Sequence, residues 1–230
     1  MMYRTHLYLA DLILPPIGEL WGISLSRKRF RAGSVKPDTT SLFVRHPHFW
    51  GLSRKFVEKR ILRLLSAELA PDAKNGRFSE ELGIVLHYVA DFFTSVHNVR
   101  PNPIARHLAS EEALHEAFLA HVGPDSVMTS FRLILGTGMR ELRKEAADLA
   151  DADRGGNGKK RKRKNEPIVR ALRELHGRFV PESGNAIHDV REILVACLTV
   201  VAFIMESAVS RSRAAHGSDS RYATASTEPN

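Results

Sequence analysis

The sequence predicts an all-α fold, in the form of one compact multi-helix domain. Segments with apolar residues three and four positions apart recur along the chain, whereas the strict alternation typical of strands is almost absent. A length of 230 residues is enough for one domain with a full core. We therefore expect a helical domain over residues 1–209, followed by a disordered tail at residues 210–230.

The N-terminal part of the chain contains two predicted helices with a loop between them. We expect a helix over residues 4–21 that breaks at Pro15 and Pro16, because proline lacks the backbone donor that a helix interior requires. Residues 33–47 contain "GSVKPDTT" and "RHPH", and their glycine and prolines predict a loop. An amphipathic helix is expected over residues 51–70.

The next predicted helix has two faces of different chemistry. Ser79 has the character of an N-cap, and Glu80 and Glu81 follow it in the first turn, where the helix dipole favours negative charge. At 100° per residue the apolar residues of this segment share one face, whereas His87 and Asp91 lie close together on the opposite side. One face is expected to pack and the other to coordinate a ligand.

The C-terminal half predicts four more helices and a flexible basic loop. Residues 105–122 and 127–149 have helical periodicity. Residues 151–167, "DADRGGNGKKRKRKNEP", contain glycines and a run of like charges, and are too polar and self-repelling to pack. A short helix over residues 168–177 and a strongly apolar central core helix over residues 187–207 are expected to follow.

The basic charge of the chain is concentrated in one place. There are 34 Lys and Arg residues against 26 Asp and Glu residues, a formal net charge of +8. The run "KKRKRK" at residues 159–164 contributes six of these positive charges, which leaves the rest of the chain close to neutral. The high pI is therefore no evidence that the folded body binds nucleic acid.

The single cysteine and the N-terminal stretch indicate a cytoplasmic protein. Cys197 lies inside an apolar run and has no partner for a disulfide, which favours a reducing compartment. Residues 1–16 lack the cationic start, long apolar core and small-residue cleavage site of a signal peptide. The apolar run at residues 194–205 is too short to span a bilayer, so we expect no transmembrane segment.

An isolated carboxylate in the stretch "LHYVADFFTSVH" suggests a metal. Between Glu81 and Arg100 the only formal charge is Asp91, and an ionised carboxylate in an apolar helix is costly without a partner. His87 and Asp91, four residues apart on one helix face, are spaced to chelate a single ion. A hydrogen-bonded His–Asp pair in the core is the alternative interpretation of this motif alone.

Further imidazoles and carboxylates favour the metal. His107 and Glu111 form a second pair four residues apart, and the remaining candidates are spread over the first half of the chain. Imidazole and carboxylate ligands suit zinc at hydrolytic sites. The eight candidate metal ligands are His6, Asp38, His48, His87, Asp91, His97, His107 and Glu111.

Five segments follow one another in the first half of the chain: "THLYLA", "GSVKPD", "HF", "ELGIVLHYVADFFTSVH" and "HLASEEAL". In that order they resemble the zinc-dependent phospholipase C family, especially its shorter, non-secreted bacterial members. The family is related to the fungal single-strand-specific nucleases. The similarity covers about residues 3–115 well and the apolar C-terminal helix loosely. It implies a multi-zinc site in a cleft between helices, and a hydrolase that cleaves phosphodiester bonds by zinc-activated water.

The resemblance also implies roles for single residues. Asp38 matches a carboxylate that is proposed in the family as the base that aligns the attacking water. The family pattern implies three sets of ligands: Asp38, His48, His87 and Asp91 for one ion; His6 with a bridging Asp91 for another; and His97, His107 and Glu111 for the last.

The number of zinc ions and the substrate are less constrained. Secreted members complete one zinc site with the amine and carbonyl of a processed N-terminus. We expect that either Met1 or Met2 brings its own amine to the metal, or that the third ion is weak or absent, which gives two or three Zn²⁺. Phospholipid is the leading substrate, ahead of nucleic acid and small phosphodiesters.

Two local motifs have alternative interpretations. His46 lies two residues before His48 and could replace it as the ligand, although "HF" fits the family pattern better. "IHDV" at His188 and Asp189 is similar to the motif of HD phosphohydrolases. Those enzymes need a further aspartate downstream, and Asp219 is the only one available.

A non-catalytic function is the second hypothesis. A zinc-stabilised helical module would bind an anionic membrane or nucleic acid through the basic run at residues 159–164. In such a module the metals contribute folding free energy, and chelation unfolds the domain. In an enzyme the same run is a solvated loop or makes a peripheral contact with an anionic membrane.

Overall fold

The computed structural model describes residues 1–69, 75–98, 104–140, 144, 167–182 and 184–219. Every regular element in these ranges is a helix, which confirms the all-α fold. The α-helices are α1 (Tyr3–Trp21), α2 (Arg27–Thr39), α3 (Leu42–Arg45), α4 (Trp50–Leu65), α5 (Gly76–Phe92), α6 (Ser95–Asn98), α7 (Ile104–His121), α8 (Pro124–Leu133), α10 (Pro167–Arg178) and α11 (Ala186–Asp219), with one π-helical segment, η1 (Ile134–Gly138).

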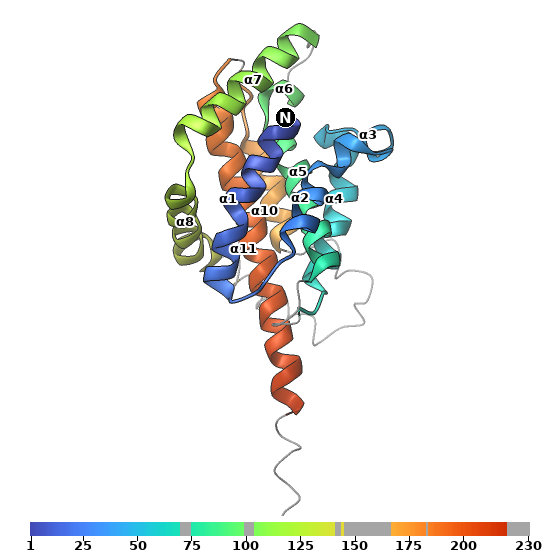
Figure 1. Ribbon diagram of the computed structural model, residues 1–230, viewed down its shortest axis with the longest axis vertical. Coiled ribbons are helices and arrows are strands. Elements are labelled where there is room, and N and C mark those ends of the chain that lie inside the picture. Colours follow the sequence, from blue (N-terminus) through green and yellow to red (C-terminus); the bar gives the residue numbers. More distant parts are fainter. Residues whose placement is uncertain (70–74, 99–103, 141–143, 145–166, 183, 220–230) are drawn as a thin grey trace, which may run out of the picture.

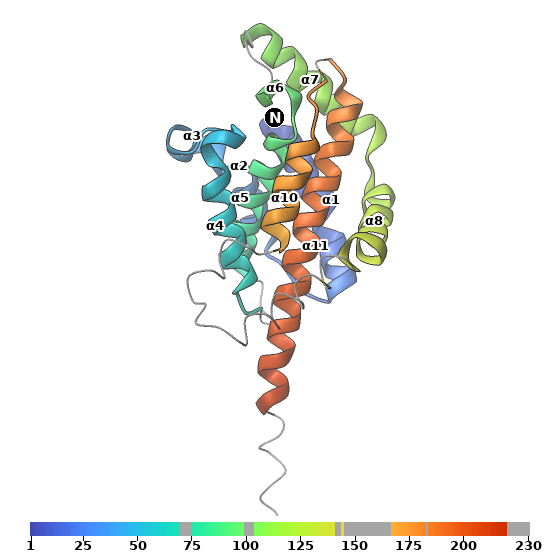
Figure 2. The ribbon, with the colours of Figure 1, turned by 180° about the vertical axis from the view of Figure 1, so that it is seen from behind.

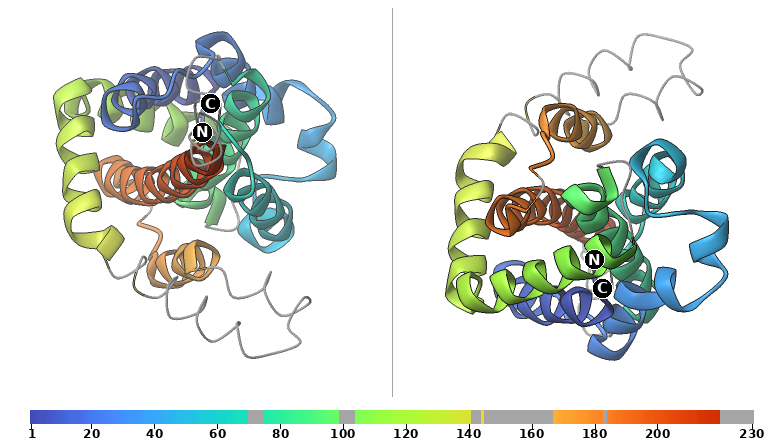
Figure 3. Two further views of the ribbon diagram at one scale, coloured as in Figure 1. Left: turned by 90° about the horizontal axis from the view of Figure 1, so that it is seen from below. Right: turned by 90° about the horizontal axis from the view of Figure 1, so that it is seen from above.

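The long helix α11 is the central element of the bundle. It runs along the long axis of the molecule (Figures 1 and 2), and the end-on views show the other helices arranged around it (Figure 3). It contacts α1, α4, α5, α7, α8 and α10. Its buried residues are almost all apolar, with Ile193, Leu198 and Ile204 at 0% exposure, so it forms the core as predicted.

This core helix is longer than the predicted one. Its segment Ala186–Arg213 is long and apolar enough to cross a membrane by length and composition, with a mean hydropathy of 2.2 in the most apolar window. The predicted run of residues 194–205 was too short to meet that test. Because 67% of the window is buried inside the fold, the segment has the burial of a core helix. α11 also continues to Asp219, so the predicted tail does not begin at residue 210.

The helix α1 is continuous through its two prolines, contrary to the predicted break. Pro16 is buried against the core, whereas Pro15 is exposed on the outer side of the helix. The helix ends at Gly22, whose φ of 67° is left-handed and whose backbone N–H donates to the carbonyl of Gly18.

The helices α2 and α3 replace most of the loop predicted over residues 33–47. Gly33 lies in the interior of α2, and a Cβ atom there would stand 2.1 Å from the carbonyl oxygen of Glu80 on α5. Gly83 on α5 has the same property, since its Cβ would stand 2.3 Å from the carbonyl oxygen of Phe30. These glycines therefore serve a close approach of α2 and α5 and do not break the helix.

Other predicted boundaries also shift. Helix α5 begins at Gly76, so Ser79 is not its N-cap; the Ser79 hydroxyl lies inside the helix, where it accepts from the backbone N–H of Ser26 and donates to the carbonyl of Asn75. The helix predicted over residues 127–149 corresponds to α8 and η1 as far as residue 138. Most of the predicted basic loop at residues 151–167 lies outside the described residues, apart from Pro167 at the start of α10.

Candidate metal centre

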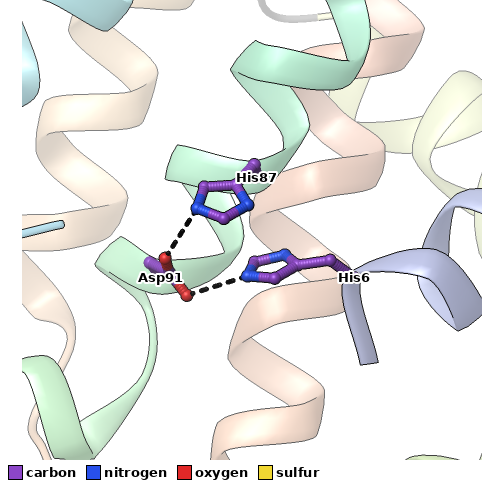
Figure 4. A group of neighbouring side chains, drawn as sticks. All are labelled: His6, His87 and Asp91. Carbon is purple, nitrogen blue, oxygen red and sulfur yellow. Dashed lines mark ion pairs between the residues drawn. The ribbon is translucent and has the colours of Figure 1, made fainter. Parts of the chain in front are cut away.

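Asp91 is the centre of a buried polar cluster at the end of α5. Its side chain is fully buried, and Figure 4 shows the imidazoles of His6 and His87 turned toward it. The distances are 3.2 Å from Oδ2 to His87 Nε2 and 3.4 Å from Oδ1 to His6 Nε2. Among the described residues, the ion pairs of Asp91 are with imidazoles and the Met1 amine, not with lysine or arginine.

The close packing of α2 on α5 sets the orientation of His87. The Nδ1 atom of His87 lies 2.9 Å from the backbone carbonyl of Ser34. Because a carbonyl can only accept, the imidazole proton is on Nδ1, and the lone pair of Nε2 is available to bind a metal. The same helix α2 carries Asp38, whose Oδ1 lies 3.5 Å from Nε2 of both His87 and His48. The approach that Gly33 and Gly83 permit therefore brings Asp38 to the cluster.

The two histidines His46 and His48 have different surroundings in the structure. His48 is buried, and its Nδ1 lies 3.0 Å from Asp91 Oδ2. The ring of His46 instead stacks on Phe56 at a centroid distance of 3.7 Å. The Tyr88 hydroxyl donates to the His46 carbonyl at 2.8 Å and so fixes the segment that presents His48. His48 is the histidine that joins the cluster.

The remaining members come from α6, α7 and the start of the chain. His107 Nε2 lies 3.2 Å from Glu111 Oε1, and the rings of His97 and His107 meet at 5.2 Å. The amine of Met1 lies 2.8 Å from Asp91 Oδ1 and 2.9 Å from both His97 Nε2 and Glu111 Oε1. The Met1 amine therefore lies at the cluster, and the number of zinc ions stays a prediction.

Burial and mutual charge shift the pKa values of these groups. Burial, with the nearby His87, lowers the pKa of His6 to about 3, and burial together with the Met1 amine lowers the pKa of His97 well below its usual value. Burial acts to raise the pKa of Asp91, but the Met1 amine and the imidazoles outweigh it and hold it well below its usual value. A neutral imidazole beside an ionised carboxylate is the state in which both bind a metal.

Several buried polar atoms of the cluster have no hydrogen-bond partner among the described residues, although they lie within ion-pair distance of one another. These atoms are Nε2 of His6, His48 and His87, and Oδ2 of Asp91. Buried polar groups are rarely left unpaired, because the lost hydration is not recovered. Four sets of residues bring ligand atoms within 4.8 Å of one another: His6, His87 and Asp91; Asp38, His48 and His87; His48, Asp91 and His97; and His97, His107 and Glu111. The donor set thus fits several adjacent divalent ions.

Comparison with known families agrees with this geometry. The sequence model of zinc-dependent phospholipase C matches residues 5–185, most of the chain. The chain belongs to the zinc-dependent phospholipase C family. No curated protein and no solved structure gives a match. The resemblance inferred from the sequence is confirmed, and with it the assignment to a family of phospholipase C-like hydrolases.

The structure brings together all eight residues that the sequence singled out, from α1, α2, α5, α6, α7 and the segment before α4. The Ser34 carbonyl, which orients His87, was not predicted from the sequence. A backbone acceptor leaves no side-chain signal in a sequence, and the segment that contains it was predicted to be a loop.

Proposed function

We propose that this protein is a zinc-dependent hydrolase of phosphodiester bonds. The observation that carries the proposal is the group of imidazole and carboxylate atoms that converge on one buried volume around Asp91, several of them without a hydrogen bond among the described residues. Zinc ions held there would lower the pKa of a bound water and stabilise charge on the attacking and leaving oxygens of the phosphodiester. The family-level match supports the same chemistry.

The ligands divide into two well-defined sets and a shared carboxylate. His87 and His48 with Asp38 form one set, and His97, His107 and Glu111 form another, each with ligand atoms within 4.8 Å of one another. Asp91 lies between them and also meets His6, which suits a bridging carboxylate. We propose two or three zinc ions; the Met1 amine, once deprotonated, would add a ligand beside Asp91, His97 and Glu111.

Asp38 is the proposed general base. Its side chain is 25% exposed, whereas the Asp91 side chain is fully buried and that of Glu111 is 11% exposed, so Asp38 is the carboxylate best placed to meet a water that enters from solvent. In the metal-free chain, burial raises the pKa of Asp38. Its role is to orient the attacking water and accept its proton.

Exposed apolar side chains beside the cluster favour a phospholipid substrate. Phe43 is 56% exposed, yet its ring meets His48 edge-on at 5.5 Å, and the adjacent Val44 is 78% exposed. On α7, Ile104 is 80% exposed and precedes His107 by one helical turn. Apolar groups at these positions suit contact with acyl chains or a membrane surface, which neither a nucleic acid nor a small phosphodiester requires.

The non-catalytic hypothesis gains no specific support. The basic run at residues 159–164 lies outside the described residues, so its contact with an anionic membrane or nucleic acid stays a prediction. A cytoplasmic location is likewise proposed from the sequence, on the single cysteine, which is buried and free.

The test combines metal analysis with a substrate screen. Purified protein is expected to contain two or three zinc ions per chain and to hydrolyse a generic phosphodiester, with phosphatidylcholine vesicles preferred over single-stranded DNA. Asp38→Asn is expected to keep most of the zinc and to lose turnover by about 10²–10⁴-fold. Asp11→Asn is the matched control, since Asp11 is similarly exposed but pairs with Arg27 and Arg31 away from the cluster. Unchanged turnover of Asp38→Asn would contradict the assigned role.

A further inference from the structure

The buried aspartate of the "IHDV" motif has a partner that the motif did not reveal. Asp189 lies in the first turn of α11 and is only 6% exposed. Its Oδ2 accepts the backbone N–H of Ser95 at 2.8 Å, and its Oδ1 accepts the Ser95 hydroxyl at 2.6 Å. The Ser95 oxygen in turn accepts the backbone N–H of Glu182 at 3.0 Å. Asp189 therefore connects the central helix to the start of α6.

The segment that Asp189 holds carries a member of the metal cluster. Ser95 is the first residue of α6, and His97 is the third. A helix of four residues, Ser95–Asn98, is a single turn and cannot maintain its own conformation through internal hydrogen bonds. The side chain of Asn98 adds two bonds back to the carbonyls of Phe92 and Thr94. The turn is thus fixed from outside, and among the described residues Asp189 is the charged group that accepts from Ser95.

Burial of the Asp189 carboxylate costs folding free energy, which indicates that the carboxylate has a specific role. Burial of a charged group requires strong hydrogen bonds in compensation, and an apolar residue would fill the same volume more cheaply. The task that the geometry indicates is the orientation of His97, whose Nε2 must stay within reach of both Asp91, at 3.6 Å, and the Met1 amine, at 2.9 Å. Groups that orient metal ligands in this way have large effects on metal affinity.

We propose that Asp189 is a positioning residue for the metal centre: through Ser95 it fixes the turn that presents His97 to the zinc ion shared with His107 and Glu111. The inference rests on the proposed zinc binding but not on the identity of the substrate. It also gives a function to a motif that has no role as an HD phosphohydrolase site, because Asp189 meets Ser95 instead of a metal ligand.

The test is a competition titration of zinc-loaded full-length protein against a chromogenic chelator. Asp189→Ala is expected to weaken one zinc ion by about 10–100-fold and to leave the other ions unchanged. Ser95→Ala should weaken the same ion less, because it retains the backbone N–H that Asp189 accepts. Asp189→Asn should restore part of the affinity, since its amide oxygen can accept that N–H. Arg191→Ala, an exposed change on the same helix, is the matched control and should have no effect.

A purely structural role for Asp189 gives a different result. In that case Asp189→Ala lowers the melting temperature equally with and without zinc and leaves every zinc affinity unchanged, which overturns the inference. If Asp189→Ala does not fold, Ser95→Ala decides the question by the same measurement. Parent protein that binds no zinc would overturn the proposed function itself, whereas zinc-loaded variants with normal affinities overturn only the role of Asp189.

Discussion

Two buried regions of this molecule differ in what completes them. Around α11 the buried residues are almost all apolar, and close packing accounts for most of their stability. Around the end of α5, His87 and Asp91 are just as deeply buried, yet Nε2 of His87 and Oδ2 of Asp91 make ion-pair contacts but no hydrogen bond within the described part of the chain. The apolar region therefore supports the fold by itself, whereas the polar region has the ligand atoms for the metal ions that we propose. The comparison separates residues that maintain the fold from residues that are proposed to bind metal.

The largest effect is expected at Asp91, which belongs to two of the four candidate ligand sets. Asp91→Asn removes the negative charge that the Met1 amine and the surrounding imidazoles face. We expect the loss of at least two zinc ions, activity below detection, and destabilisation of about 3–5 kcal/mol, as is typical when one partner of a buried pair is removed. Metal analysis and urea unfolding measure the two effects.

The matched change in the apolar region is Leu198→Ala on α11, where the side chain is fully buried. It is expected to cost about 2–5 kcal/mol of unfolding free energy through the cavity that it creates. The zinc content of the folded fraction should stay that of the parent. If Leu198→Ala and Asp91→Asn had equal unfolding free energies and lost the same amount of zinc, the apolar and polar regions would not have separate roles.

The sequence predicted local relationships within this site better than distant ones. The spacing of His87 and Asp91 places them on one helix face, and helical geometry alone predicts that they meet. The arrival of His6, His48 and His107 at the same place depends on tertiary packing, which no spacing in the sequence encodes. That convergence was expected only because the ordered motifs resembled a known family.

The error at α2 has a physical cause. Gly33 and Pro37 are helix breakers in isolation, and they led to a predicted loop. In the folded protein Gly33 gains more from the close approach to α5 than it loses in helix propensity, and Pro37 is buried within α2. Intrinsic propensity is a weak prior that tertiary context overrides. Here the overriding contact is also the one that brings Asp38 and the Ser34 carbonyl to His87.

A smaller effect on stability and zinc binding is expected at the contact between α2 and α5, which positions the polar cluster. Gly83→Ala would place a Cβ 2.3 Å from the backbone oxygen of Phe30, so α2 must move away from α5. We expect destabilisation of about 1–3 kcal/mol, as for other overpacked interiors, together with weaker zinc binding because Asp38 moves with α2. Urea unfolding and the chelator titration measure these changes.

Gly76→Ala is the control for this change within the same helix. A Cβ at Gly76 would meet the side chain of Arg29 at 3.7 Å, an ordinary contact. Its stability should be unchanged or slightly higher, and its zinc affinity should equal that of the parent. Parent-like zinc affinity in Gly83→Ala would show that the spacing of α2 and α5 does not control the metal centre.

The smallest effect concerns His176, which lies outside both regions compared above. Its ring stacks on Trp50 at 4.1 Å, and burial lowers its pKa to about 4, against an opposing backbone hydrogen bond with Phe92. The unfolded chain, with a histidine pKa of about 6.5, binds more protons than the folded chain between about pH 4 and pH 6.5. The stability that this histidine contributes is therefore complete above about pH 6.5 and is lost as the pH falls toward 4.

His176→Phe keeps an aromatic ring against Trp50 but cannot take up a proton. We expect the variant to lose less stability than the parent between pH 6.5 and pH 4, and to differ little from it at pH 7.5. Urea midpoints measured across this range in zinc-free protein test the difference, because the imidazoles of the cluster titrate alike in both proteins. His121→Gln, at the exposed end of α7, should follow the parent. An identical pH dependence for His176→Phe would mean that acid sensitivity arises entirely in the polar region.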